Sequence, residues 1–251
     1  CVGDDRMSML RCLRGLGAKI TEHAFCEISQ ADECFEICGL GTGGLSEPTM
    51  PLNAGNSGTT IRLVAGLASG QAFMTVLTGD DSLRSRPMAR IVKPLTQMGA
   101  QIMGRESDTL APLSIRGGDL KAIHYTMPVA SAQLKSSILI AGLCADGETV
   151  LEQPVASRDH TERMMMAMGA QLETDGLNVS IRRSELNSIN VRVPGDMSSA
   201  AFWLVAASCH PNSSIRLPRV GINSTRTGVI DVLQAMGASV RLENIQDHRG
   251  E

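Results

Sequence analysis

Four segments of the chain share one pattern of apolar and polar positions. Each ends in Leu or Met, and Gly-Ala follows before an alternating run. Apolar residues recur at spacings of three and four ahead of this ending, except that the third copy begins with Thr161 and keeps only Met165 and Met168. The spacing predicts a helix with one buried face, and the glycine is typical of a left-handed C-terminal cap. The alternating runs predict strands. The four endings begin at Leu16, Met98, Met168 and Met236.

Two of these helices follow a second shared element, a proline among small residues. Pro128 precedes Met168, and Pro194 precedes Met236, by nearly the same number of residues. This indicates two copies of a strand-helix-strand-helix module. The polar, weakly patterned stretch 184–190 predicts a boundary, with a first lobe at 1–188 and one further module at 189–251. A module of that size rarely closes a core alone, so we expect the second lobe to be unfinished.

Composition narrows the class of protein. The chain has 251 residues, 43% hydrophobic and 20% charged, which is typical of a globular protein, and its formal net charge of -3 provides no field for nucleic acid. Aromatic residues make up 2%, too few to stack on single-stranded bases. The longest apolar runs are far shorter than the roughly 18 to 20 residues of a membrane span.

The seven cysteines are odd in number, irregularly spaced and without a Cys-x-x-Cys pair, which favours a reduced compartment. A zinc site formed by His23, Cys26, Cys34 and Cys38 is an alternative interpretation. It is disfavoured because the paired close spacings of structural zinc ligands are absent.

A loop rich in glycine and hydroxyl groups, residues 53–60, precedes the apolar stretch 61–67. Such a loop presents unpaired backbone N–H groups to an anion at a helix N-terminus, and Asn56, Ser57, Thr59 and Thr60 offer further donors. Arg62, about one helical turn further on, either points its guanidinium toward the same end or stabilises the loop from behind. The alternative is a helix N-cap with a tight turn. A P-loop is not indicated, because no Gly-Lys-Ser/Thr follows.

Three more loops gather polar groups before predicted helices. Residues 80–88 contain Arg84 and Arg86 before Pro87, which we expect at a helix start, unless the segment is only a solvated surface loop. Residues 131–137 bring hydroxyl, amide and ammonium groups to the start of an apolar helix at 138–145, and residues 157–162 precede the third Gly-Ala helix. For both, capping is the alternative, with Ser157 or Asp159 and Glu162 fitting a capping box. If the repeats bring these four helix starts to one face, they form a pocket suited to a phosphorylated or carboxylated small molecule.

Five strings resemble 5-enolpyruvylshikimate-3-phosphate synthases, in order along the whole chain. They are Gly-Asn-Ser-Gly-Thr-Thr-Ile-Arg (55–62), Leu-Thr-Gly-Asp-Asp-Ser-Leu-Arg-Ser-Arg-Pro-Met (77–88), Pro-Val-Ala-Ser-Ala-Gln-Leu-Lys-Ser (128–136), Ser-Arg-Asp-His-Thr-Glu (157–162) and Asn-Ser-Thr-Arg-Thr-Gly (223–228). The resemblance implies an α/β (α+β) fold of repeated β-α-β-α-β-β units in two lobes. It also implies transfer of the enolpyruvyl group of phosphoenolpyruvate to the 5-hydroxyl of shikimate 3-phosphate, with release of phosphate.

The resemblance also assigns site residues. Gly58 and Arg86 are expected to contact phosphoenolpyruvate, with Asn56 and Thr59 shaping the loop and Arg62 supporting it. Gln133 is expected to touch both substrates. The remaining residues implied for the shikimate 3-phosphate site are Ser131, Ala132, Ser157 and Arg158. No metal or organic cofactor, nucleic acid or membrane is implied, and the expected enzyme is a cytoplasmic monomer, sensitive to glyphosate because Gly58 leaves room for it.

The catalytic acid and base are not among these residues. The family's Lys-Ser pair precedes the position of Cys1, and its aspartate base and Lys-Glu pair follow that of Glu251. We therefore expect a fragment of such a synthase, with a first repeat unit incomplete at its start, that is not competent alone. The alternatives are a non-catalytic anion-binding fragment and the sister transferase acting on UDP-N-acetylglucosamine, whose loop at 77–88 normally carries a cysteine that is absent here.

Overall fold

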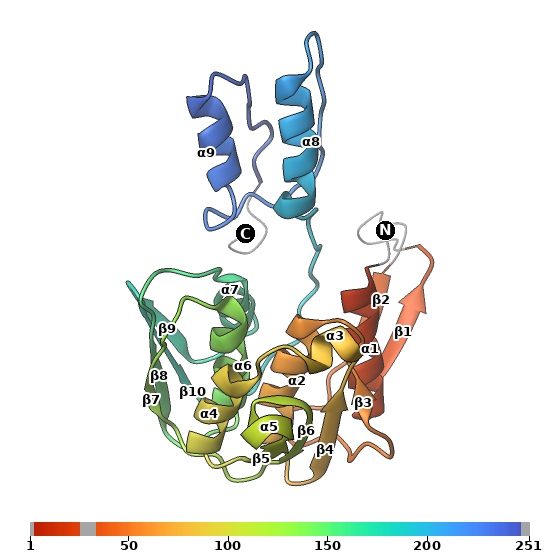
Figure 1. Cartoon of the computed structure of the whole chain (residues 1–251), viewed down its shortest axis with the longest axis vertical. Coiled ribbons are helices and arrows are strands. Elements are labelled where there is room, and N and C mark those ends of the chain that lie inside the picture. The colour runs from red at the N-terminus through yellow and green to blue at the C-terminus, as the bar shows by residue number, and fades with distance from the viewer. Residues whose placement is uncertain (1–2, 26–33, 247–251) are drawn as a thin grey trace.

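The computed structural model of the chain describes residues 3–25 and 34–246. Its first elements are helix α1 (Asp4–Gly15) and an antiparallel pair of strands, β1 (Lys19–His23) and β2 (Cys34–Cys38). Two four-stranded sheets and a pair of helices follow (Figure 1). The predicted α/β fold with repeated units is confirmed.

The first four-stranded sheet has the order β3-β4-β6-β5, with β3 parallel to β4 and the other pairs antiparallel. Helix α2 (Gly58–Ser69) connects β3 to β4, whereas α3 (Asp81–Arg84) and α4 (Ala89–Gln97) connect β4 to β5. The short turn α5 (Arg105–Asp108) lies between β5 and β6. The strands are β3 (Leu52–Asn53), β4 (Met74–Thr78), β5 (Gln101–Gly104) and β6 (Leu110–Arg116).

The second four-stranded sheet repeats this arrangement as β7-β8-β10-β9, again with only its first pair parallel. Helix α6 (Ala132–Gly142) connects β7 to β8, and α7 (His160–Ala167) connects β8 to β9. Each sheet is therefore formed by its own copy of a β-α-β-α-β-β unit. The strands are β7 (His124–Thr126), β8 (Glu148–Glu152), β9 (Leu172–Asp175) and β10 (Asn178–Arg182).

The four predicted helix ends form as expected. Helices α1, α4, α7 and α9 (Gly228–Ala235) each end just before the Leu-Gly-Ala or Met-Gly-Ala triplet. In α4 the Ala100 N–H donates to the Leu95 carbonyl oxygen at 3.1 Å, and the same bond closes the other three helices. The intervening glycines all have positive φ, as this cap requires: Gly17, Gly99, Gly169 and Gly237.

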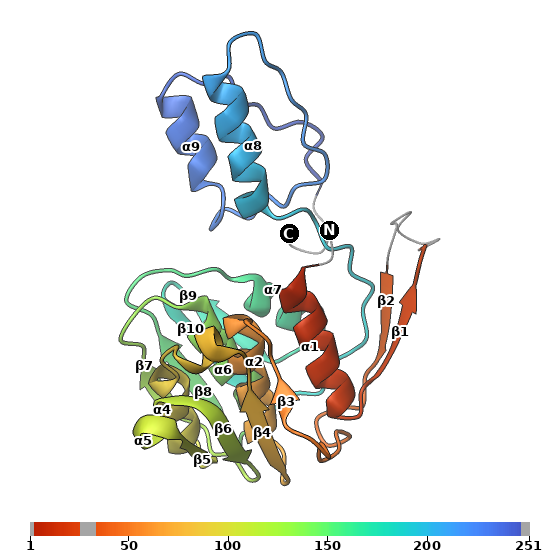
Figure 2. The same cartoon turned by 45° about the vertical axis from the view of Figure 1, so that its right-hand side comes forward.

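Helices α2 and α6 lie side by side at the centre, with the sheets around them (Figures 1 and 2). They approach so closely that a Cβ on Gly66 of α2 would lie 2.2 Å from the Ser137 carbonyl oxygen of α6. Residues 134–139 of α6 are all buried, which explains why this helix has no polar face. The expected apolar helix at 138–145 in fact starts earlier, at Ala132, and ends at Gly142.

A pair of helices, α8 (Met197–Cys209) and α9, follows a segment without helix or strand at 183–194 (Figure 1). The predicted boundary at residue 188 lies in this segment. The strands predicted around α8 are not formed in the described residues, and only a parallel bridge between Gly195 and Val220 stands in their place. The prediction was wrong because paired strands need neighbouring strands, which this part of the described chain does not supply.

The α8–α9 pair has a small core formed by Met197, Ala200 and Ile230. Helix α8 is apolar on all sides, yet Phe202 and Trp203 are 77% and 63% exposed. A helix that is apolar on all sides is typical of a protein interior, but no described residues cover the outer face of α8. Within residues 3–25 and 34–246, none of the helices has the length and hydrophobicity of a membrane span.

Candidate substrate-binding site

The glycine-rich loop opens α2, as expected, and part of it is a cap. The buried Ser57 is the N-cap of α2, and its Oγ accepts a hydrogen bond from the Thr60 N–H at 3.1 Å. The capping interpretation is therefore correct for Ser57. Asn56 and Thr59 are exposed, and their side chains bond to other loops. The loop thus has donors and acceptors beyond those that cap its helix.

Arg62 connects three of the predicted loops. Its Nη1 donates to the Gly58 carbonyl oxygen at 3.0 Å and to Gln133 Oε1 at 2.9 Å, and its Nη2 donates to the Pro87 carbonyl oxygen at 3.3 Å. Gln133 in turn donates through Nε2 to Thr59 Oγ1 at 2.8 Å. The first turns of α2 and α6 and the loop before α4 are thereby fixed to one another.

Arg86 is held beside this network by Asn56. Its Nη2 donates to Asn56 Oδ1, and Asn56 Nδ2 donates to Asp80 Oδ2 at 2.7 Å. Asp80 caps α3 by accepting the Leu83 N–H at 2.7 Å. The chain of contacts fixes the Arg86 guanidinium next to the start of α2.

Pro87 was expected to begin the following helix, and it does not. Helix α4 begins at Ala89 with Met88 as N-cap, so Pro87 lies one residue outside. The Pro87 carbonyl oxygen accepts from Arg62, and Met88 N–H donates to Thr109. The segment beside Arg86 is therefore held by these two hydrogen bonds and not by a position of Pro87 inside the helix.

The site carries a concentration of positive charge. Burial lowers the pKa of Arg62 from its ordinary value, and the neighbouring Arg86 and Arg90 lower it further. The hydrogen bond from Asn56 and the Leu83 N–H hold the pKa of Asp80 below its usual range, with smaller contributions from Arg86 and Arg84. A bound anion would relieve the mutual repulsion of the guanidinium groups. The start of α2 adds its dipole to the same effect.

Gly58 has no room for a side chain in this arrangement. A Cβ at this position would lie 2.6 Å from Arg62 Nη1 and 3.3 Å from Arg86 Nη1. Glycine therefore allows the two guanidinium groups to approach the backbone at the start of α2.

The second group of expected residues lies at the starts of α6 and α7. Ser131 is the N-cap of α6, and its Oγ accepts from the Leu134 N–H at 3.3 Å. Ser157 Oγ donates to Gln153 Oε1 at 2.6 Å. Arg158 is exposed, and its side chain has no hydrogen bond or ion pair with the described residues. Its guanidinium is available to an anion.

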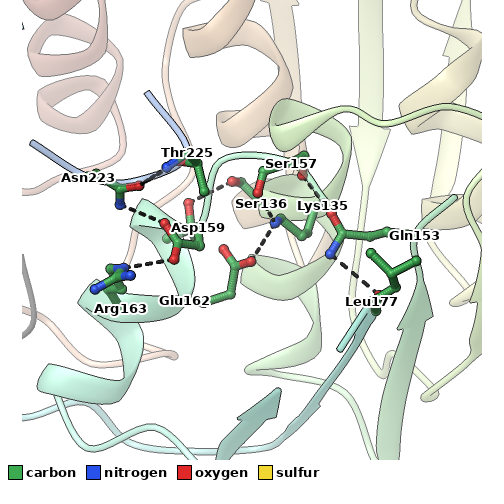
Figure 3. Close-up of polar contacts among 11 residues, drawn as sticks. Lys135, Ser136, Gln153, Ser157, Asp159, Glu162, Arg163, Leu177, Asn223 and Thr225 are labelled. Carbon is green, nitrogen blue, oxygen red and sulfur yellow. Dashed lines mark hydrogen bonds and ion pairs between the residues drawn. The ribbon is translucent and has the colours of Figure 1, made fainter. Parts of the chain in front are cut away.

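The capping box expected at α7 is absent. Asp159 occupies the N-cap position, but its carboxylate accepts from Asn223 Nδ2 at 2.7 Å and from Arg163 Nε at 2.8 Å instead of from the helix backbone. Glu162 pairs with Lys135 (Figure 3). The prediction was wrong because both carboxylates have stronger, charged or amide donors from other segments.

Lys135 is likewise not among the exposed groups at the start of α6, where it was expected. Its side chain is fully buried, so it offers no charge to a ligand directly. The sequence predicts Glu162 only as part of a helix cap, and it predicts no contact for Asn223, which opens the segment 223–228 that resembles the synthases. The one available signal was a lysine followed by the apolar run of α6.

Of the four residues considered as zinc ligands, Cys26 lies outside the described residues, so the structure places only His23, Cys34 and Cys38. Among residues 3–25 and 34–246, no three His, Cys, Asp or Glu side chains are placed to hold a metal ion.

The sequence model of EPSP synthase (3-phosphoshikimate 1-carboxyvinyltransferase) matches residues 2–250. The chain belongs to the EPSP synthase family. A 3-phosphoshikimate 1-carboxyvinyltransferase of Synechococcus sp. (strain JA-3-3Ab) is 51% identical over 255 residues, covering 100% of this chain and 56% of that protein. One from Geobacillus kaustophilus is 49% identical over 250 residues, covering 99% of this chain and 57% of the relative.

Solved structures of this family have the same fold. An EPSP synthase from Acinetobacter baumannii is 44% identical and superposes with a TM-score of 0.89, covering 100% of this chain and 55% of that one. The chain thus spans little more than half the length of these EPSP synthases.

Proposed function

We propose that this chain binds phosphoenolpyruvate and shikimate 3-phosphate as part of an enzyme that transfers the enolpyruvyl group to the 5-hydroxyl of shikimate 3-phosphate and releases phosphate. The observation that carries the proposal is the Gln133 side chain. It bonds to Thr59 and Arg62 on one side and belongs, on the other, to the turn of Ser131 and Ala132. One residue thus joins the two groups of ligand-binding candidates.

Phosphoenolpyruvate would bind at the start of α2. Arg86 provides a guanidinium suited to a carboxylate or phosphate, and Asn56 holds it in place. Gly58 keeps the backbone accessible, and Thr59 orients Gln133. The guanidinium of Arg62 donates to two carbonyl oxygens and to Gln133, so this residue would hold the loop in place more than contact the ligand.

The phosphate of shikimate 3-phosphate would bind at the start of α6. The first N–H groups of a helix have no partner within it, so Ala132 and Gln133 offer backbone donors there. The Ser131 hydroxyl accepts from Leu134 and can still donate to a phosphate oxygen. Arg158 adds a free guanidinium. The Ser157 hydroxyl can donate to a phosphate oxygen in exchange for its hydrogen bond to Gln153 Oε1. Neutral donors and one cation suit a phosphate ester.

The described residues are suited to binding more than to proton transfer. The reaction must add a proton to the methylene carbon of phosphoenolpyruvate and remove one from the attacking hydroxyl, which requires groups that titrate near neutral pH. Burial alone would raise the pKa of Asp159, but the hydrogen bonds from Asn223 and Arg163 outweigh it and lower that pKa. The pKa of Asp80 is also lowered. Neither is suited to act as a base, so a binding role without turnover is the second candidate for these 251 residues.

The remaining features of the proposal are a monomeric enzyme in the cytoplasm, acting without metal or organic cofactor. Scattered cysteines without a Cys-x-x-Cys pair support a reduced compartment. A boundary between two lobes near residue 188 belongs to the same proposal.

Calorimetric titration of the 251-residue chain tests the proposal. Shikimate 3-phosphate should bind saturably, phosphoenolpyruvate should bind more tightly once it is present, and UDP-N-acetylglucosamine should not compete. Phosphate release measured in the same mixture separates turnover from binding. Binding of the UDP sugar in place of shikimate 3-phosphate, or of neither, would contradict the proposal.

A further inference from the structure

A fully buried lysine lies next to the proposed phosphate site without facing it. Lys135 of α6 is 0% exposed, and its Nζ lies 2.5 Å from Oε1 of Glu162 in α7, which is 2% exposed (Figure 3). The same ammonium group donates to the carbonyl oxygen of Ser157 at 3.4 Å. One buried cation therefore contacts both α7 and the turn that precedes it.

Stability does not explain this pair. Removing two charges from water costs several kcal/mol per ion, and buried ion pairs often contribute less to stability than apolar residues of the same volume. The second carboxylate oxygen of Glu162, Oε2, has no hydrogen-bond partner in the described structure. An ion pair that leaves one buried oxygen without a hydrogen bond is better explained by the way it positions the segments it joins.

That geometry concerns two turns that are far apart in the sequence. The Lys135 N–H donates to the Ser131 carbonyl oxygen at 3.0 Å, so Lys135 lies one helical turn beyond the serine that opens α6. Its ammonium then reaches the Ser157 carbonyl oxygen. A third contact between the same segments joins Ser136 Oγ and Thr161 Oγ1 at 2.6 Å. The start of α6 and the turn at Ser157 are thus held at a fixed separation.

We propose that Lys135 and Glu162 are positioning residues that hold the turn of Ser157 and Arg158 at the distance from the first turn of α6 that one phosphate group can span. The proposal rests on the proposed function, since the phosphate is that of shikimate 3-phosphate. Glu162 fixes the ammonium, and the ammonium fixes the Ser157 backbone. Donors for an anion must be placed within about 0.5 Å, and a buried charge-assisted contact provides that constraint.

Two variants separate positioning from stability. Lys135→Met leaves Glu162 buried without its partner, so it should lower both stability and affinity for shikimate 3-phosphate. The double variant Lys135→Met/Glu162→Met removes both charges and should recover most of the stability. It should not recover affinity, because nothing then holds the Ser157 carbonyl oxygen. The matched control is Arg182→Met, which breaks an exposed ion pair with Glu148.

Three measurements are made on each variant: urea unfolding, calorimetric affinity for shikimate 3-phosphate, and ¹⁵N relaxation of the Ser157 and Arg158 amides. In the double variant we expect near wild-type stability, at least tenfold weaker binding, and order parameters that fall from about 0.85 to below about 0.6. Recovery of affinity together with stability, or order parameters equal to those of the wild type, would overturn the proposal. If Lys135→Met fails to fold, the affinity and order parameters of the double variant alone test the proposal.

The same experiment distinguishes the two proposals. If the wild-type chain does not bind shikimate 3-phosphate, the proposed function fails. The order parameters of Ser157 and Arg158 then still show whether the buried pair positions the turn.

Discussion

Asp159 and Asn223 are 64 positions apart in the sequence and share a hydrogen bond of 2.7 Å, which ties the start of α7 to the segment between α8 and α9. Asn223 also organises its own turn, because its Oδ1 accepts from the backbone N–H of Thr225 at 2.9 Å. Figure 3 shows these side chains meeting from two different parts of the chain. The contact bridges the segment 183–194, which has no regular structure.

The link should depend on pH. The hydrogen bonds from Asn223 and Arg163 lower the pKa of Asp159, although burial opposes them. A lowered pKa means that the folded state favours the carboxylate. The contribution is therefore complete above the ordinary Asp value of about 3.9 and is lost as the pH falls through the lowered pKa. The side-chain amide signals of Asn223 in NMR spectra should move in this acidic range and stay constant from pH 5 to 7.

Asp159→Ala should abolish that titration and loosen the turn at Asn223, because a hydrogen bond to a charged group contributes about 1.5–3 kcal/mol. The control is Asp175→Ala, which removes an exposed carboxylate from β9. Asn223 signals that still titrate in Asp159→Ala, or that are lost equally in both variants, would contradict the assignment.

Gly58→Ala should weaken phosphoenolpyruvate binding at least tenfold while leaving the fold intact. The new Cβ would meet Arg62 Nη1 at 2.6 Å and push the guanidinium away from Gln133. Alanine at the start of a helix is itself favourable, so stability should not fall. Calorimetry and urea unfolding measure the two effects, with Gly43→Ala as control because a Cβ there has no neighbour within 4 Å. Equal affinities in the two variants would count against the pocket.

Gly66→Ala should destabilise the chain by about 1–3 kcal/mol, as overpacking does in a core. The added Cβ would lie 2.2 Å from a backbone oxygen of Ser137, so α2 and α6 would have to separate. Gly228→Ala, at the open start of α9, has no such neighbour and should be neutral or stabilise by up to ~1 kcal/mol. Urea midpoints test the contrast, and similar midpoints for the two variants would refute the close approach of α2 and α6.

Cys12 should resist thiol reagents in the native chain. Its side chain lies 1% exposed in α1, and burial raises its pKa to about 11. Cys209 is exposed and should react with N-ethylmaleimide at pH 8 within minutes. Peptide mass spectrometry compares the two rates. Equal labelling before unfolding would mean that α1 is not packed on the neighbouring strand β3.

Local signals predicted much of the fold. The four Gly-Ala helix ends are a local feature, since the cap needs only a glycine at positive φ and a bond back into the same helix, and all four were predicted correctly. The helix after the glycine-rich loop was also predicted from a local signal, namely small and hydroxyl residues followed by an apolar stretch. Strands around α8 were not, because a strand forms only with a neighbour, and alternation along one segment does not report whether a neighbour is present.

The missed residues have a common physical cause. Lysine and glutamate are almost never fully buried unless paired, so a sequence pattern places them at the surface or in a cap. Lys135 and Glu162 are 27 positions apart, and only the packing of α6 against α7 brings them together. The bond between Asn223 and Asp159 likewise depends on the three-dimensional path of the chain.

The most direct test of the central claim, that the starts of α6 and α7 together bind shikimate 3-phosphate, is an NMR titration of the ¹⁵N-labelled chain with this compound. The account predicts saturable shifts of the Ala132, Gln133, Ser157 and Arg158 amides with a single dissociation constant, and none in β1 or β2. Absence of saturable shifts, or shifts confined to other parts of the chain, would contradict it.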